Sequence, residues 1–204
     1  MDFSLYRKFK SKINTYKPYQ YWYETGKEYQ DEFEYSEFFK LQEKVFLNVL
    51  RELSFESVLE FGCGFGRMTK LILENFPVKK YVAFDLSPHQ IQNAKKNCSS
   101  FDVDFHVSTI LDFKYKEKFD LVFGSEVLLH VKPLDIQKVI KHLLNYPKKN
   151  MLNIDFFPVE IPNNLAKHNF IHPYEKIYLK FENVKNVITT QIKEKQCIFN
   201  AEIS

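Results

Sequence analysis

The sequence predicts a doubly wound α/β fold with a mostly parallel sheet, and three observations support that prediction. Short apolar runs alternate with segments of helical periodicity from residue 57 onward. Three of the five glycines in the chain lie at positions 62, 64 and 66, directly after the first apolar run. Two further β-rich runs close the chain. Strands that alternate with helices in this way form parallel sheets with right-handed crossovers.

The first half of the chain supplies two strand–helix units around the glycines. Residues 57–61 are a short apolar run and residues 67–76 place apolar side chains at helical spacing, so we expect a strand followed by a helix. A second strand is expected at 81–84. Ser87 and Pro88 follow it, and they suit the N-cap and the first position of another helix.

The second half continues the alternation and then ends differently. Strands are expected at 103–107, 119–123 and 151–156, and residues 136–144 predict an amphipathic helix before the last of them. After a short helix that opens near residue 173, two β-rich runs follow each other closely, which is typical of a hairpin. We therefore expect a seven-stranded sheet, mostly parallel, with an antiparallel C-terminal hairpin.

Composition and charge disfavour several classes of protein. The net charge is only +3, and nearly all of the basic residues are lysines. Arginine occurs only at positions 7, 51 and 67, so side chains that bind phosphate or guanine bidentately are few. Three cysteines are too few and odd in number for a secreted disulfide framework. No stretch approaches the ~20 apolar residues of a membrane span. These features favour a cytoplasmic protein and disfavour a dedicated nucleic-acid binder.

Two segments fall outside the alternating core. Residues 1–35 are rich in tyrosine and contain the single tryptophan, and residues 157–172 show no clear period. We expect 1–35 to form an N-terminal aromatic cap on a domain that spans 36–204, and both segments are candidates for a lid. The helix expected from about residue 36 to residue 53 has an apolar stripe that we assign to the core. Its members are Phe38, Leu41, Val45, Phe46 and Val49.

The glycine-rich turn after the first strand is the expected ligand site, because such turns lie at the switch point of doubly wound sheets. Its spacing differs from the dinucleotide pattern G-x-G-x-x-G and from the phosphate loop that ends in G-K-[ST]. Glu60 ends the strand that feeds the turn, where a carboxylate would repel a pyrophosphate and suit an ammonium or sulfonium group. Asp85 ends the second strand and can accept two hydrogen bonds from a ribose diol. The pattern predicts a pocket for a nucleoside with a cationic amino-acid tail.

Three spaced motifs together resemble one family. Residues 58–66 (VLEFGCGFG) are similar to the first motif of class I S-adenosylmethionine-dependent methyltransferases, and residues 82–87 (VAFDLS) to their second. Residues 119–130 (FDLVFGSEVLLH) resemble the fourth-strand segment of the small-molecule branch. The resemblance covers about residues 40–155 and implies a Rossmann-like fold, whose seventh strand inserts antiparallel between the fifth and the sixth.

The resemblance also implies roles for individual residues toward the cofactor S-adenosylmethionine. Glu60 would face its methionine end, the glycines would let the backbone approach, Asp85 would bind the ribose and Leu86 would pack on the adenine. The family often has Gly-Asp after the third strand, where this chain has Ser-Thr-Ile, so Thr109, the backbone near Ile110 or Asp112 would substitute. Cys63 is interpreted as a buried filler rather than a nucleophile. The predicted cofactor-binding residues are Glu60, Gly62, Cys63, Gly64, Gly66, Asp85, Leu86, Thr109, Ile110, Trp22 and Tyr29. The aromatic residues of the cap either contact the cofactor or simply pack the N-terminal segment onto the sheet.

The methyl acceptor should meet the end of the fourth strand. The Asn/Asp-Pro-Pro-Tyr/Phe motif of adenine and glutamine methyltransferases is missing there, and no cysteine lies nearby for pyrimidine C5 methylation. Glu126 and His130 are the predicted catalytic residues, the histidine because its ordinary pKa lies near neutrality; packing is the alternative for His130. His168 and His172 have the spacing of helical metal ligands, but surrounding prolines and the lack of an acid partner disfavour a metal. One of these two histidines facing the acceptor is the alternative.

We therefore expect a methyltransferase that acts on oxygen or nitrogen of a small molecule. Methylation of a protein or an RNA is the second hypothesis, and a non-catalytic protein that binds S-adenosylmethionine or S-adenosylhomocysteine is the third.

Overall fold

The computed structural model describes residues 16–26, 36–156, 166, 168–193 and 196–204. Seven strands form one sheet in the order β3 (Asp104–Val107), β2 (Lys80–Asp85), β1 (Ser57–Phe61), β4 (Phe119–Ser125), β5 (Pro147–Phe156), β7 (Gln196–Ile203) and β6 (Val184–Lys193). β7 is antiparallel to both β5 and β6, and the other neighbours pair in parallel. The predicted doubly wound sheet with a C-terminal antiparallel hairpin is confirmed.

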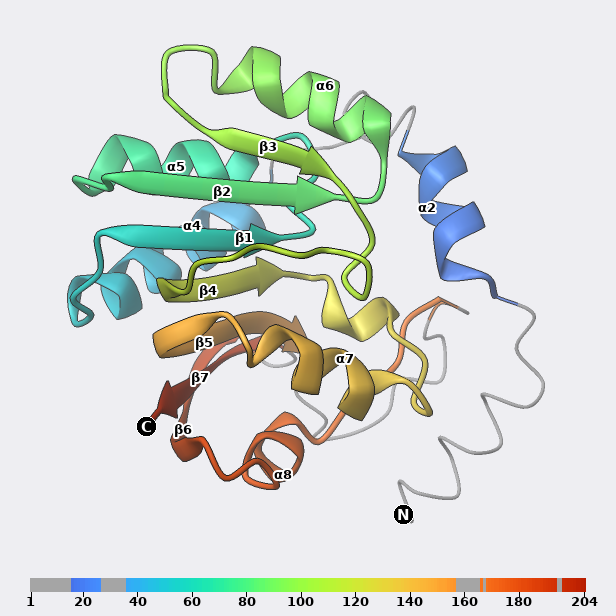
Figure 1. Cartoon of the computed structure of the whole chain (residues 1–204), viewed down its shortest axis with the longest axis vertical. Coiled ribbons are helices and arrows are strands. Elements are labelled where there is room, and N and C mark those ends of the chain that lie inside the picture. The colour runs from blue at the N-terminus through green and yellow to red at the C-terminus, as the bar shows by residue number, and fades with distance from the viewer. Residues whose placement is uncertain (1–15, 27–35, 157–165, 167, 194–195) are drawn as a thin grey trace.

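Helices cover both faces of the sheet (Figure 1). α4 (Glu37–Arg51), α5 (Arg67–Asn75) and α6 (Pro88–Asn97) share one apolar cluster with the sheet. α7 (Ile136–Leu143) and α8 (Tyr174–Tyr178) share a second cluster on the opposite face. The two clusters therefore enclose the sheet as a central layer. In the described part of the chain, no helix is long and apolar enough to cross a membrane.

Two short elements that the sequence did not predict lie at the carboxyl ends of the parallel strands. α2 (Pro18–Thr25) stands beyond the ends of β1 and β2, and η1 (Leu128–His130) is a 3₁₀ turn after β4 (Figure 1). The side chain of Gln90 in α6 donates a hydrogen bond of 2.7 Å to the carbonyl oxygen of Gly26, which ties the end of α2 to the domain. Both elements border the expected ligand site.

One prediction for α4 is wrong. The apolar stripe places Leu41 in the core, but 36% of the residue is exposed, whereas its neighbour Gln42 is fully buried. Burial of an amide is favourable only where it is hydrogen-bonded, and Gln42 has partners in α5 and β7. A polar contact between distant elements therefore sets the rotation of this helix, and the apolar pattern alone does not.

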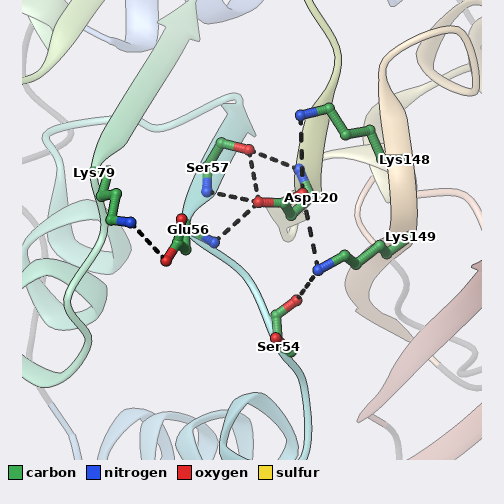
Figure 2. A network of polar contacts seen from close by, with 7 residues as sticks. All are labelled: Ser54, Glu56, Ser57, Lys79, Asp120, Lys148 and Lys149. Atoms are coloured by element: carbon green, nitrogen blue, oxygen red, sulfur yellow. Dashed lines mark hydrogen bonds and ion pairs between the residues drawn. The ribbon is translucent and has the colours of Figure 1, made fainter.

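At the other end of the sheet, where β1 and β4 begin, a polar network centred on Asp120 joins these two strands (Figure 2). Asp120 Oδ2 accepts hydrogen bonds from the backbone amides of Glu56 and Ser57, at 3.0 and 3.1 Å, and from the Ser57 hydroxyl at 2.9 Å. Lys148 and Lys149 lie 3.9 and 4.0 Å from Oδ1. Because Ser57 belongs to β1 and Asp120 to β4, this network fixes the register of the two strands whose other ends form the site.

Candidate functional site

A cavity of about 670 Å³ lies at the carboxyl ends of β1, β2 and β4. α2 and residues 168–169 form part of its wall, so segments far apart in the sequence enclose it. Most of the predicted site residues line this cavity. They are Glu60, Gly62, Cys63, Gly64, Asp85, Leu86, Thr109, Ile110, Glu126, His130 and Trp22.

Two predicted cofactor-binding residues stand apart from that set. Gly66 is not part of the cavity wall: it is the N-cap of α5, and a Cβ built there would come within 3.0 Å of Cys98 Sγ and 3.2 Å of Ala94. Its positive φ of 84° and this close packing explain why a glycine occupies the position. Tyr29 lies outside the described residues.

Backbone amides of the glycine loop donate hydrogen bonds to carbonyl oxygens within the protein. The amides of Gly62 and Cys63 donate to the carbonyl oxygen of Phe84, at 2.7 and 3.1 Å, and the amide of Gly66 donates to the carbonyl oxygen of Cys63 at 3.0 Å. A pyrophosphate site needs amides that point at the ligand. These amides have internal partners, so the loop suits a ligand without phosphate, as the position of Glu60 also indicates.

Asp85 joins the ends of β1 and β2. Its Oδ2 accepts a hydrogen bond of 3.0 Å from the amide of Gly64, and its Oδ1 accepts one of 2.8 Å from the amide of Ser87. Burial raises the pKa of the carboxyl, and these amide hydrogen bonds oppose that shift. A carboxylate can accept about four hydrogen bonds, so each oxygen keeps capacity for a hydroxyl in the cavity.

The carboxyl of Glu60 is fixed by two hydroxyls, one from α5 and one from β2. Its Oε2 accepts hydrogen bonds from the hydroxyls of Thr69, at 2.5 Å, and Tyr81, at 2.7 Å, and only 2% of the residue is exposed. Burial raises the pKa of Glu60 to about 7, although the two hydroxyls lower it. A cation in the cavity would favour the ionised form further.

Glu126 follows β4 directly and has an unusual backbone. Its φ of 58° lies in the left-handed region, and its amide donates to the carbonyl oxygen of Ile154 at 2.8 Å. Gln196 Nε2 donates to Glu126 Oε1 at 2.7 Å. Burial raises the pKa of Glu126, which Arg67 and the neighbouring amides oppose. Non-glycine residues in this conformation recur at functional sites.

His130 is enclosed by the aromatic wall of the cavity. Its ring centroid lies 4.4 Å from that of Trp22, and Trp22 Nε1 donates to the Tyr16 hydroxyl at 2.9 Å. His130 Nδ1 lies 3.2 Å from the carbonyl oxygen of His168, so the neutral ring carries its proton on Nδ1. Burial lowers the pKa of His130 to about 3. The ring is therefore neutral at physiological pH.

His168 and His172 do not face a common point. His168 lines the cavity, whereas His172 is fully buried with its Nε2 3.0 Å from the carbonyl oxygen of Val131. Across the described residues, no group of three or more His, Cys, Asp or Glu side chains is arranged to hold a metal ion.

The wall after β3 also differs in detail from the expectation. The Thr109 hydroxyl donates to Asp112 Oδ2 at 2.6 Å, and Asp112 itself is exposed and outside the cavity. Thr109 and Ile110 therefore line this side. Cys63 is buried, and burial raises the pKa of its thiol, as expected for a filler.

Among the cavity residues that the sequence did not single out, two have buried polar atoms. Gln90 Oε1 and Ser125 Oγ line the cavity, are buried, and have no hydrogen-bond partner among the described residues. Buried polar atoms in folded proteins are normally paired, so these two atoms fit a polar ligand. The available signals were weak: Gln90 lies in the first turn of α6 and Ser125 ends an apolar strand.

Comparison with known proteins agrees with this geometry. Residues 58–150 match the family model described as "Methyltransferase domain". Malonyl-[acyl-carrier protein] O-methyltransferase of Acetivibrio thermocellus is 30% identical over 96 residues, which are 45% of this chain and 34% of that protein. Trans-aconitate 2-methyltransferase of an Enterobacter species is 25% identical over 124 residues, 59% of this chain and 45% of that protein.

A solved structure extends the likeness to nearly the whole chain. Magnesium protoporphyrin IX methyltransferase of Synechocystis PCC 6803, with bound S-adenosylhomocysteine, superposes with a TM-score of 0.69 at 14% identity. The match covers 91% of this chain and 97% of that one. At this identity the likeness concerns the fold. The chain spans about a third of the length of the first curated relatives it matches.

Proposed function

Because this chain belongs to the class I S-adenosylmethionine-dependent methyltransferase family, we propose that it transfers a methyl group to an oxygen or nitrogen of a small molecule. The observation that carries the proposal is the pairing of two acids across the glycine loop. Glu60 and Asp85 both border one cavity of about 670 Å³, and Asp85 bonds the loop itself. A nucleoside with a cationic tail needs this combination of carboxylates and close backbone.

The cofactor would be held by residues from three strand ends. Asp85 would accept the ribose hydroxyls, and Leu86 and Ile110 would pack against the adenine. Glu60 would lie toward the methionine end. Elsewhere in the cavity wall, Ser125 Oγ and Gln90 Oε1 offer further hydrogen-bonding capacity. S-adenosylmethionine supplies an electrophilic methyl group on a sulfonium. The chain's own residues bind the cofactor, orient the methyl acceptor toward it and exclude water from the cavity.

Glu126 is the proposed proton acceptor for the methyl acceptor. A general base works best when its pKa lies near the working pH. Burial moves the pKa of Glu126 upward, toward neutrality, and moves that of His130 down to about 3. Of the two predicted catalytic residues, His130 is therefore better suited to shaping the wall, and Glu126 to removing a proton.

The enclosed wall supports a small acceptor. Tyr16, Trp22, His130 and His168 close one side of the cavity with ring contacts, which suits a compact ligand better than an extended macromolecule. The names of two relatives give malonyl-[acyl-carrier protein] and trans-aconitate as acceptors, which supports a small organic acid group, free or carried on a protein, as the acceptor here. We also propose that residues 1–35 act as a cap on a 36–204 domain, because α2 and Tyr16 contribute to this wall.

The test uses methyl-labelled S-adenosylmethionine and an extract of the source cells. Purified protein and its Asp85→Ala variant are incubated with both, and label is separated into acid-soluble and acid-precipitable fractions. We expect wild-type protein to move label into a soluble product distinct from the cofactor, and the variant to lose at least about tenfold in rate, as loss of hydrogen bonds to a charged group implies. Label in a protease- or ribonuclease-sensitive precipitate would replace the small acceptor with a protein or an RNA. No transfer, with S-adenosylhomocysteine still bound, would indicate a non-catalytic binding protein.

A further inference from the structure

A chain of buried and partly buried hydrogen bonds leads from Arg67 of α5 to Glu126 through α4 and β7. Arg67 Nη2 donates to Gln42 Oε1 at 2.7 Å, and Gln42 Nε2 donates to Gln196 Oε1 at 3.2 Å. Gln196 Nε2 then donates to Glu126 Oε1 at 2.7 Å. Gln42 is fully buried and Gln196 is 2% exposed. Neither glutamine lines the cavity, so the chain of hydrogen bonds reaches the cavity at Glu126.

The direction of these hydrogen bonds is fixed at the arginine. A guanidinium only donates, so Gln42 must present its oxygen to Arg67 and its amide nitrogen to Gln196. The same logic turns the amide nitrogen of Gln196 toward Glu126. The glutamate therefore receives a donor and no acceptor at Oε1, which favours its ionised form. Successive hydrogen bonds in such a chain also polarise and strengthen one another where they are buried.

Arg67 is itself anchored. Its Nη1 forms a 2.7 Å ion pair with Glu43, and its guanidinium lies 4.9 Å from the centroid of the Phe39 ring. Both partners belong to α4. The chain thus begins at a fixed charge and ends at a residue whose backbone, with φ at 58°, is held in the left-handed region.

We propose that Gln196 and Gln42 are positioning residues, which hold the Glu126 carboxylate ionised and turned into the cavity to accept a proton from the methyl acceptor. The inference rests on the proposed methyl transfer. It adds that the C-terminal hairpin, through the first residue of β7, takes part in the site. Among the described residues, the titratable groups that act on Glu126 are Arg67 from α5 and Asp155 from β5.

The test measures the titration of Glu126 directly and needs no identified acceptor. Protein labelled with ¹³C at the glutamate side-chain carboxyl is titrated by NMR, and the Glu126 signal is assigned from its loss in Glu126→Gln. In Gln196→Met, which keeps the length and loses the donor, we expect the pKa of Glu126 to rise by about one pH unit, as loss of a hydrogen bond to a charged group implies. Gln42→Met should shift it in the same direction by less. The exposed Gln191 of β6 gives the control, Gln191→Met, which should leave it unchanged.

Two functional readouts separate this inference from the proposed function. S-adenosylhomocysteine affinity should change by less than about threefold in Gln196→Met, and the rate of label transfer into the extract should fall about tenfold at neutral pH and recover toward alkaline pH. Wild-type protein that fails to bind S-adenosylhomocysteine overturns the proposed function. Wild-type protein that binds and transfers, with an unchanged Glu126 titration and rate in Gln196→Met and Gln42→Met, overturns the positioning role alone.

Discussion

Asp120 lies near the start of β4 and Glu126 follows its end, and the two acids differ in exposure, in partners and in the direction of their pKa shifts. Asp120 lies at the start of the strand with 15% of its side chain exposed, next to two lysines. Burial alone would raise its pKa, but hydrogen bonds from Glu56 and Ser57 lower it overall. Glu126 follows the end of the strand, lies in the cavity wall, and burial raises its pKa.

The difference shows how one strand serves both fold and site. The Asp120 network takes its donors from Ser57 of β1 and from Glu56 just before that strand, and it fixes the register of β1 and β4 (Figure 2). The Glu126 network supplies a donor from Gln196 too, but the carboxyl stays buried and its pKa stays raised. A well-paired carboxylate stabilises the folded state, whereas a desolvated one is a functional-site candidate.

The largest effect is expected from Glu126→Gln. The amide cannot remove a proton, so label transfer should fall by at least about 100-fold, the usual contribution of a general base. The free energy of unfolding should change little, because the substitution removes a buried charge and keeps the shape. Rates come from the labelled extract assay and stability from urea unfolding. Full activity in the variant would remove Glu126 from the mechanism.

Asp120→Ala should give the converse result. It removes three hydrogen bonds to Oδ2 at the strand start, so the free energy of unfolding should fall by about 2 kcal/mol. The affinity for S-adenosylhomocysteine should stay within about twofold at a temperature where the variant is folded. Urea unfolding and calorimetry measure the two quantities. A variant that keeps its stability but loses affinity would reverse the comparison between the ends of β4.

A smaller, pH-dependent effect is expected from a third acid. Asp155 of β5 accepts hydrogen bonds from Asn153 Nδ2 at 2.8 Å and from the amide of Leu129 at 3.2 Å, and burial raises its pKa to about 8. The folded protein then keeps a proton that the unfolded chain releases above its ordinary pKa. Stability should therefore fall as the pH rises from about 5 to about 8, with a slope of at most about 1.4 kcal/mol per pH unit from this group.

Asp155→Asn isolates that contribution. The amide does not titrate, so the slope of unfolding free energy against pH should become shallower, with the part due to Glu60 left in place. Urea unfolding at several pH values between about 5 and 8 gives the slope for both proteins. An identical slope in the two proteins would mean that Asp155 is ionised in the folded state.

Sequence predicted the parts of the site that are local. The strand–turn–helix pattern located Glu60 and the glycine loop, and the end of the next strand located Asp85, because each depends on a few consecutive residues. Gln42 and Gln196 are 154 residues apart in the chain. Their pairing depends on how α4 and β7 pack, which neither local pattern encodes. The apolar stripe accordingly misplaced Leu41.

Burial explains the other differences. The ordinary pKa of histidine made His130 a candidate base in the sequence, but the ring is buried beside Trp22 and His168, and burial lowers its pKa to about 3. Gly66 matched the spacing of the loop, yet its role is close packing of α5 against α6. Such properties arise from neighbours that come together only in the folded chain.

The most direct test of the central claim is a calorimetric titration with S-adenosylhomocysteine of the wild-type protein, Asp85→Ala and Asp120→Ala. The account predicts one site per chain in the wild type, at least about tenfold weaker binding in Asp85→Ala, and affinity close to wild type in Asp120→Ala. Absence of binding to the wild type, or equal affinity in the wild type and Asp85→Ala, would contradict it.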